Sequence, residues 1–307
     1  MRLVYSHDGR KTTKGRLNYD KYGYFFVAPF ILIFLIFQLY PIAYTINLSF
    51  TDLKGWETEY NYVIFKNFKN LLHNKIFLKS IMNTLIIWTM NFIPQLLVAL
   101  FLAERFTNTV VKIRGKGLYK VLFYLPGIIT AASVSVLFFS LFGYPVGPIN
   151  SILESLKLID SPFEFFRSKI ATRSIVAFIQ FWMFYGSTMI MIISAIMGID
   201  TSIFEAGMID GTNSRKAFRY ITLPLIKPVM LYILVTSLIG GLQIFDIPYL
   251  LTGGAPDNSV GTVTMYIYNQ AFTGGRNFGI AAAAAVILLL IIMVLSACLF
   301  RFFRDEK

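Results

Sequence analysis

Charged side chains are scarce in this sequence of 307 residues: Asp, Glu, Lys and Arg together account for 14%, while 56% of the residues are hydrophobic. The mean hydropathy is +0.64. An ordinary soluble domain has about 25% charged residues, so the composition excludes a soluble domain of the usual kind. It predicts a chain that lies in a lipid bilayer.

Side chains that perform chemistry are also few. The sequence has one cysteine, Cys298, and two histidines, His7 and His73. A single cysteine cannot form a disulfide within the chain, and neither histidine has neighbours at metal-ligand spacing. No glycine-rich loop ends in Gly-Lys-Ser or Gly-Lys-Thr, so the usual nucleotide-binding loop is missing. We therefore expect no catalytic residue, no metal site and no cofactor bound by this chain.

Long apolar stretches, in contrast, are numerous. A spanning helix needs about 20 apolar residues, because the hydrocarbon layer is about 30 Å thick and a helix rises about 1.5 Å per residue. The stretches that reach this length are 23–50, 80–103, 121–142, 173–197, 228–251 and 278–302. We predict an all-α integral membrane protein with six transmembrane helices.

The basic residues predict how these helices are oriented. Of the 28 Lys and Arg, the larger share lies before the first stretch, between the second and third, between the fourth and fifth, and after the sixth. Because Lys and Arg concentrate in cytoplasmic loops, both termini are expected in the cytoplasm. Topology and attraction to membrane lipid then explain the net charge of +12, and no nucleic-acid-binding module is recognisable.

The expected organisation is one membrane domain with short extensions. Residues 1–22 form a cytoplasmic N-terminal segment, residues 23–302 the transmembrane domain, and residues 303–307 a cytoplasmic tail. The longest outer loops, 51–79 and 143–172, have room for a short helix but not for an independent core.

One polar segment interrupts the apolar pattern between the fourth and fifth stretches. It reads "FEAGMIDGTNSRKAFRYITLPLIKP" and covers residues 204–228. At its start, "SIFE" fits a capping box in which Ser202 and Glu205 exchange hydrogen bonds, which predicts the first turn of a helix. Gly211 should end that helix with a positive φ, a conformation that glycine adopts at little cost.

A second helix is expected directly after this bend. The "TNS" at 212–214 offers a new N-cap, and the helix should end at Leu223, because the residue before Pro224 is pushed out of helical geometry. The result would be two short helices at a fixed angle on the cytoplasmic side. From the physics alone, this unit is either a docking site for a partner or an interfacial helix under the membrane.

The polar segment resembles the Glu-Ala-Ala signature of ABC importer permeases. The residues in register are Glu205, Ala206, Asp210, Gly211, Phe218, Ile221, Leu223, Pro224 and Pro228, while Gly207 and Thr212 stand where alanine is usual. The likeness covers nearly the whole chain and points to the first permease of the carbohydrate-uptake branch, which includes maltose-, lactose-, raffinose- and glycerol-phosphate-type importers. The other stretches that carry it are "YPIAYTINLSFTDLKG", "NFKNLL", "NTL", "FYLPGIITAASVS" and "IFDIPYLLTGGAPDNSVGTVTMYIYNQAF".

This resemblance implies the fold, the partners and the location. The fold would be that of a type I ABC importer permease in the cytoplasmic membrane of a prokaryote. The partners would be a second homologous permease, two cytoplasmic ATPase subunits that bind ATP and Mg²⁺, and an extracellular or periplasmic sugar-binding protein. Residues 200–228 would be the coupling loop to the ATPase. Its implied contact residues are Glu205, Ala206, Gly207, Asp210, Gly211, Phe218 and Pro224.

Candidate substrate contacts follow from the same resemblance, because helices four and five face the cavity in maltose-type relatives. A sugar needs hydrogen-bonding groups and an aromatic face. The candidates are Gln180, Trp182, Tyr185, Ser187, Thr236, Gln243 and Asp246. The alternative is that these side chains only hydrogen-bond between helices. Asp246 is expected near the outer surface, about 27 Å beyond Pro228 along an unbroken helix.

Other positions and other functions stay open at this point. Gly240, Gly241 and the alanines at 281–285 should let helices approach closely, and Asn91 and Gln95 either line the path or pair with neighbours. A permease for glycerol phosphate or a peptide is the nearest alternative. A stand-alone secondary transporter would favour buried charged pairs or inverted repeats, and neither is visible in the sequence.

Overall fold

The computed structural model describes residues 20–57, 59–108 and 113–304, and it divides the chain into two compact units, 1–47 and 48–307. The described part of the first unit is a single apolar span, Gly23–Ser49, whose last residues reach into the second unit. It consists of α1 (Asp20–Phe34), a π-helical turn (Leu35–Leu39) and α2 (Tyr40–Ser49). The predicted cytoplasmic ends lie mostly outside the described residues.

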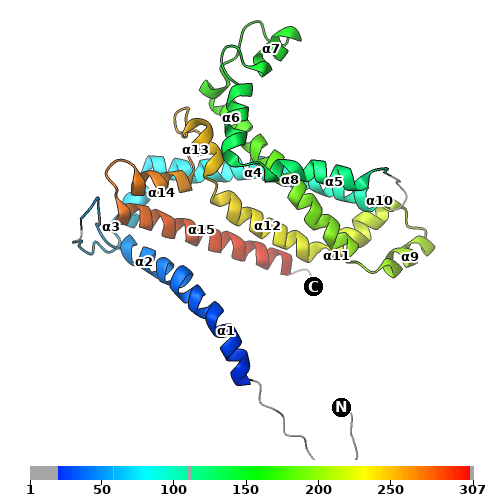
Figure 1. Cartoon of the computed structure of the whole chain (residues 1–307), viewed down its shortest axis with the longest axis horizontal. Coiled ribbons are helices and arrows are strands. Elements are labelled where there is room, and N and C mark those ends of the chain that lie inside the picture. Colours follow the sequence, from blue (N-terminus) through cyan, green and yellow to red (C-terminus); the bar gives the residue numbers. More distant parts are fainter. Residues whose placement is uncertain (1–19, 58, 109–112, 305–307) are drawn as a thin grey trace, which may run out of the picture. The chain divides into compact units, whose positions relative to one another are not determined.

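The second unit is built around two long helices that pack along each other, α4 (Lys75–Thr107) and α8 (Lys169–Met197) (Figure 1). Small residues let them approach, since Ala99 and Ala103 of α4 are fully buried beside Met189 and Ile192 of α8. Side chains of α12 (Lys227–Leu242), such as Ile233, complete this core.

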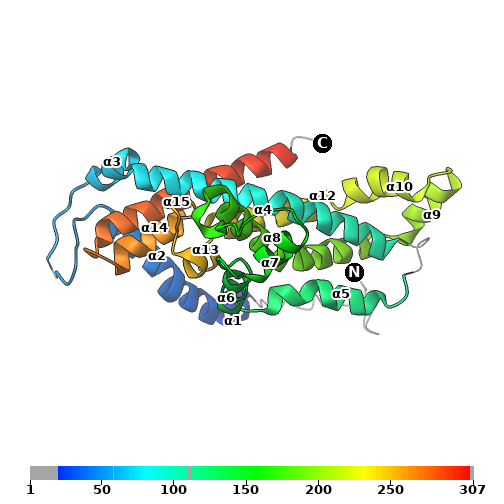
Figure 2. The ribbon, with the colours of Figure 1, turned by 90° about the horizontal axis from the view of Figure 1, so that it is seen from above.

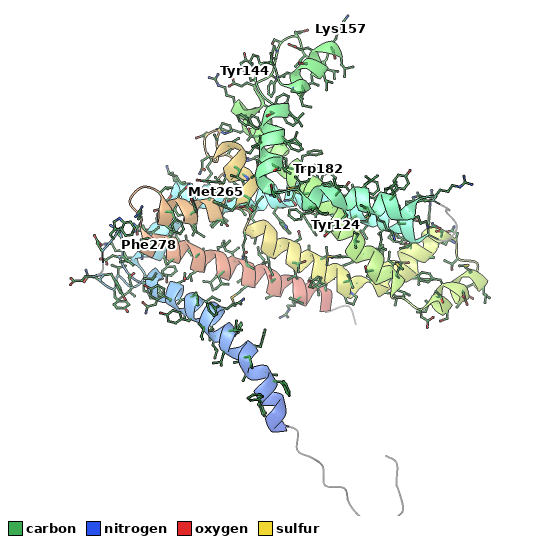
Figure 3. All side chains as sticks on the ribbon, in the orientation of Figure 1. Tyr124, Tyr144, Lys157, Trp182, Met265 and Phe278 are labelled. Carbon is green, nitrogen blue, oxygen red and sulfur yellow. The ribbon has the colours of Figure 1, made fainter. Side chains whose placement is uncertain are left out.

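A second helix layer contains α15 (Phe278–Arg304), which packs on α12, on α14 (Val263–Phe272) and on α3 (Lys66–His73). Four alanines of α15, at 281–284, are buried. The expectation that this small-residue run permits close packing is confirmed. Figure 3 shows the side chains of the described residues, with Phe278 at the start of α15.

The third predicted span is not one straight helix. It divides into α5 (Lys116–Tyr124) with a 3-10 turn (Leu125–Ile128), and α6 (Ala131–Leu141), which bends away by 91°. Pro126 and Gly127 stand at the bend, and the Thr130 side chain caps α6 by accepting from the Ser133 amide at 3.3 Å. Counting this bent pair as one span, the described residues have up to six candidate spans, as predicted.

The fifth predicted helix is also broken. It stops at Leu242 and resumes as α13 (Asp246–Thr252). The Ile244 carbonyl, which the break frees, accepts a hydrogen bond of 2.7 Å from the Thr262 hydroxyl. The distance of about 27 Å to Asp246 assumed an unbroken helix, so it does not apply, and the location of Asp246 near the outer surface stays a prediction.

The connections carry only short elements. The connection after α6 holds α7 (Pro148–Ser155) and a 3-10 turn (Phe165–Arg167), and α3 lies in the connection before α4, so each of these two loops holds a short helix, as expected. Strand pairing among the described residues is limited to two isolated bridges, Thr51 with Tyr62 and Lys54 with Asn277. The all-α fold class is confirmed.

Candidate functional site

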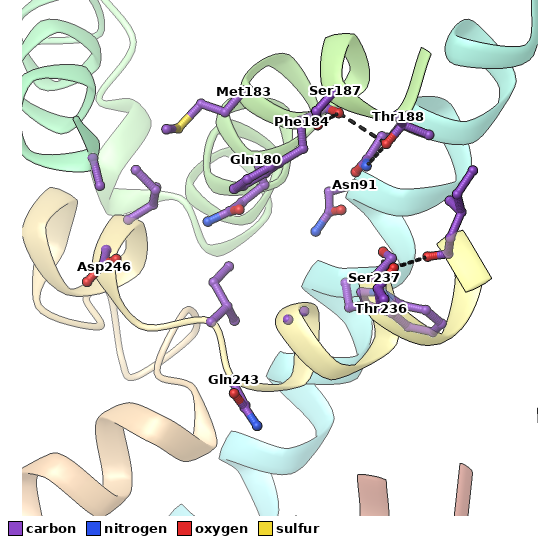
Figure 4. A pocket seen from close by; sticks show the side chains of 18 of the residues that line it. Asn91, Gln180, Met183, Phe184, Ser187, Thr188, Thr236, Ser237, Gln243 and Asp246 are labelled. Atoms are coloured by element: carbon purple, nitrogen blue, oxygen red, sulfur yellow. Dashed lines mark hydrogen bonds between the residues drawn. The ribbon is translucent and has the colours of Figure 1, made fainter. Parts of the chain in front are cut away.

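A cavity of about 550 Å³ opens between α4, α8, α12 and the break that follows α12 (Figure 4). In the figure, Asn91 and Gln180 point into this space from facing helices, and Gln243 and Asp246 border it from the break. The lining residues are Trp88, Asn91, Gln95, Ala131, Gln180, Met183, Phe184, Ser187, Thr188, Met191, Ile233, Thr236, Ser237, Gly240, Gly241, Gln243, Ile244, Phe245, Asp246 and Ile247.

Helical periodicity explains which residues reach the cavity. On α8 the lining positions begin at Gln180 and recur three or four residues apart up to Met191, so they form one face of the helix. Trp88, Asn91 and Gln95 follow the same rule on α4. The break after α12 and the start of α13 add a third wall, which includes Gln243 and Asp246.

Part of the polar lining is used to hold helices together. The Gln95 amide donates to the Thr188 hydroxyl at 2.8 Å, which joins α4 to α8. The Trp88 indole N–H donates to the Ser237 hydroxyl at 3.2 Å, which joins α4 to α12. Gly241 permits this second contact, since a Cβ there would collide with the Trp88 ring. Interhelical hydrogen bonding is thus the structural role of these side chains.

Two hydroxyls and one amide in the lining are bonded within their own helices. Ser187 donates to the Phe184 carbonyl at 2.9 Å and Thr236 to the Tyr232 carbonyl at 2.8 Å. The Asn91 amide donates to the Ile87 carbonyl at 3.2 Å. Each keeps an oxygen that can accept a hydrogen bond from a ligand.

Three lining side chains differ from these. Gln180, Gln243 and Asp246 have no hydrogen-bond partner within the part of the chain that the structure describes. Gln243 and Asp246 are exposed, and Gln180 is half-buried. These are the groups in the lining that remain fully available to a ligand.

Two of the sequence candidates lie away from the cavity. Trp182 packs on Phe138 of α6, with ring centroids 5.8 Å apart (Figure 3). Tyr185 lies between Phe181 and Phe123, at centroid distances of 5.4 Å and 6.1 Å. The aromatic rings that line the cavity are instead those of Trp88, Phe184 and Phe245, which the sequence candidates did not include. Phe184 and Trp88 stand at helical spacing from Gln180 and Asn91, and this spacing was the signal that could have identified them.

The polar segment folds into short helices at one end of the second unit (Figure 2). The first, α9 (Thr201–Ile209), begins two residues earlier than a capping box at Ser202 would place it. Asp200 is the N-cap, and its carboxylate accepts from the Ser202 amide at 2.9 Å. The predicted box between Ser202 and Glu205 is wrong, because the Asp200 side chain already occupies the Ser202 amide. This hydrogen bond holds the pKa of Asp200 below its ordinary value.

The bend and the second cap are confirmed. Gly211 has φ +76°, and the Asn213 side chain accepts from the Lys216 amide at 2.9 Å. The helical path then continues as α10 (Ser214–Ala217), a π-helical turn (Phe218–Thr222) and α11 (Leu223–Leu225). It therefore passes the predicted end at Leu223, since Pro224 lies in the first turn of α11, where no amide donor is needed.

The same segment has an inner and an outer face. Phe218 and Leu223 pack against the core of α4, α8 and α12, and the Asn108 amide donates to the Ser214 hydroxyl at 2.6 Å. Gly207 permits close packing inside the segment, because a Cβ there would lie 2.8 Å from Ile221 Cδ1.

The outer face carries the remaining candidates for coupling. The exposed ones are Glu205, Ala206, Asp210, Gly211 and Pro224. The apolar side chain of Ile209 beside them is 86% exposed.

The opposite end of α4 is fixed by a polar network. Lys79 and Lys169 contact the Asp257 carboxylate at 3.4 Å and 2.6 Å, and hydrogen bonding, first from Lys169, holds the pKa of Asp257 below its ordinary value. Arg173 donates to Asn83 and, at 2.8 Å, to the Ser259 carbonyl. The loop after α13 is thereby tied to α4 and α8.

The sequence features and this fold recur in known proteins. Residues 24–304 match the family described as "Binding-protein-dependent transport system inner membrane component". The chain belongs to this family. It is therefore the multi-pass permease component of such a system in the cytoplasmic membrane.

Individual relatives are similar over most of their length. The lactose transport system permease protein LacF of Rhizobium radiobacter is 33% identical, over 94% of this chain and 96% of that protein. The arabinooligosaccharides transport system permease protein AraP of Bacillus subtilis is 32% identical, over 80% and 77%. A bacterial ABC transporter that imports the acidic polysaccharide alginate shares the fold, with a TM-score of 0.78 and 23% identity over 94% of this chain and 96% of that chain.

Proposed function

We propose that this permease carries a di- or oligosaccharide across the cytoplasmic membrane as part of an ABC importer. The observation that supports this most directly is the cavity between α4, α8 and α12, where amide, hydroxyl and carboxyl groups lie beside the rings of Trp88, Phe184 and Phe245. Sugar sites combine such hydrogen-bonding groups with apolar faces. Relatives named for lactose and arabinooligosaccharides add support for a sugar as the substrate class.

The partners of this permease belong to the same proposal. A second, similar permease completes the cavity, an extracellular binding protein delivers the sugar, and two ATPase subunits bind ATP and Mg²⁺. The chain itself is not an enzyme. Residues 200–228 rest on an ATPase through the exposed face that includes Glu205 and Ile209. Closure of the ATPases on ATP moves these segments, and the helices alternate between outward and inward access to the cavity.

The test is uptake by the intact complex, purified from its native membrane through a tag on this chain. Proteoliposomes receive the binding protein outside and ATP inside, and labelled lactose, arabinobiose and maltose are offered. We expect ATP-dependent accumulation of at least one sugar by the complex and none by this chain alone. ATP hydrolysis by the purified chain alone would contradict its non-catalytic role, and failure of the complex to accumulate any sugar would contradict the substrate class.

A further inference from the structure

The cavity has one charged group in its described lining. This is Asp246 in the first turn of α13, and no lysine or arginine lines the cavity. An anionic ligand would meet this carboxylate without an opposing cation from this chain, and like charges repel each other. The lining therefore disfavours an anion.

The available polar groups have a chemistry in common. The amides of Gln180 and Gln243 can each donate and accept, and the Asp246 carboxylate accepts. Within the described residues none of the three has a partner, whereas Gln95 and Trp88 are committed to Thr188 and Ser237. A ligand that covers these groups takes them out of water, so it must supply complementary hydrogen-bonding groups.

A sugar with free hydroxyls supplies these complementary donors and acceptors. Its O–H groups donate to Asp246 and to the amide oxygens, and its oxygens accept from the amide nitrogens. Phe184 and Phe245 add apolar surface to the same lining. An ionised carboxylate or phosphate group lacks a donor, so that group of an anionic sugar cannot satisfy Asp246 and is repelled by it.

We infer that this cavity selects an uncharged, hydroxyl-rich sugar and excludes anionic ones, through contacts from Gln180, Gln243 and Asp246. Such selection rests on the proposed function, because it requires the cavity to lie on the path of the sugar. The fold alone does not decide the charge of the cargo, since the solved transporter with the same fold imports an acidic polysaccharide. The lining side chains of each chain must make that choice.

Binding to the membrane complex without its binding protein tests this selection directly. The probes are a neutral disaccharide that the complex accumulates and its aldonate, made by oxidising the reducing end, for example lactose and lactobionate. Saturation-transfer NMR on the complex in nanodiscs gives both dissociation constants. We expect the aldonate to bind at least about tenfold more weakly, the scale of one lost charge-assisted hydrogen bond plus repulsion.

Substitutions of the three lining residues test which of them discriminates between the neutral sugar and its aldonate. Asp246→Asn removes the charge at nearly constant shape, so it should reduce the gap between the two probes to about threefold or less. Gln180→Ala and Gln243→Ala should each weaken binding of the neutral sugar by roughly five- to tenfold. Matched controls are Asp160→Asn and Gln270→Ala, which make the same changes outside the cavity lining and should alter neither value.

The possible results separate a failure of the selection, of the role of Asp246 and of the proposed function. An aldonate that binds as well as the neutral sugar overturns the selection. A gap that persists in Asp246→Asn, in a complex of normal thermal stability, means that Asp246 only stabilises the first turn of α13. If the complex accumulates no sugar at all, the proposed function fails, and the selection with it.

Discussion

Gly186 sets the distance between α8 and the chain just before the bend in the third span. A Cβ at this position would collide with the Phe123 carbonyl and the Tyr124 backbone, which cannot move aside as a flexible side chain can. Gly186→Ala should therefore lower the stability of the permease by about 1–3 kcal/mol through overpacking. Thermal unfolding of the purified protein in detergent measures the effect.

Gly240→Ala is the matched control for this prediction. It adds the same methyl group where nothing lies within 4 Å, so the melting temperature should stay the same or rise. Equal melting temperatures for wild type and Gly186→Ala would mean that α8 can shift away from Phe123 at little cost.

Single residues also show where prediction from the sequence succeeded. Gln180, Ser187, Thr236, Gln243 and Asp246 all line the cavity, although their contact with substrate stays a prediction. Trp182 was chosen for its aromatic ring, but at about 100° per residue it lies roughly 200° around α8 from Gln180, against the core. Phe184 provides the ring on the cavity face instead. The helical spacing from Gln180 was therefore a better guide to the cavity-lining residues of α8 than the type of each residue.

At the scale of the elements, the breaks within the helices were harder to predict than the positions of the apolar stretches. Hydropathy located the apolar stretches, but it does not indicate a break of the helix within such a stretch. The bend at Pro126 and Gly127 had a local signal in the sequence. At the break after Leu242, the Ile244 carbonyl accepts from Thr262, eighteen positions further along the chain, and only the folded chain reveals that hydrogen bond. Both breaks shape the cavity, because they place Ala131 and Asp246 in its wall.

The bend between α9 and α10 is the element on which coupling should depend. Gly211→Val puts a branched side chain at φ +76°, which costs about 1–2 kcal/mol and re-aims α10. Glu205→Ala should leave α9 folded, since Asp200 is the cap, yet remove a charged contact from the exposed face. In both variants we expect lower sugar uptake and less ATPase retained on purification, at normal permease levels.

Gly274→Val is a matched control for this element. Gly274 also has a positive φ, +62°, and nothing within 4 Å, but it lies in the loop between α14 and α15. The local strain is similar, so uptake and ATPase retention should stay normal. Normal uptake by Gly211→Val and Glu205→Ala would show that the polar segment is only an interfacial loop. Loss of ATPase in Gly274→Val would show that general strain, not coupling, is responsible.

For the whole molecule, α4 fixes two sites on opposite sides of the membrane. Asp257 contacts Lys79 near the start of α4, and Ser214, three residues after the bend at Gly211, accepts from Asn108 at the end of α4. At about 1.5 Å per residue, Lys79 and Asn108 are about 43 Å apart, more than the hydrocarbon thickness. The distribution of Lys and Arg predicts which side is which, with Thr212 in the cytoplasm and both termini on that side.

Cysteine labelling of intact cells tests this orientation. The background is Cys298→Ser, because Cys298 is exposed and would react itself. With a membrane-impermeant maleimide, Asp257→Cys should be labelled in intact cells, and Thr212→Cys only after permeabilisation. Both sites are on exposed or half-buried loop residues, so access differs only through the membrane. The reverse pattern would place the polar segment outside, where no ATPase could reach it, and would overturn the orientation and the coupling proposal together.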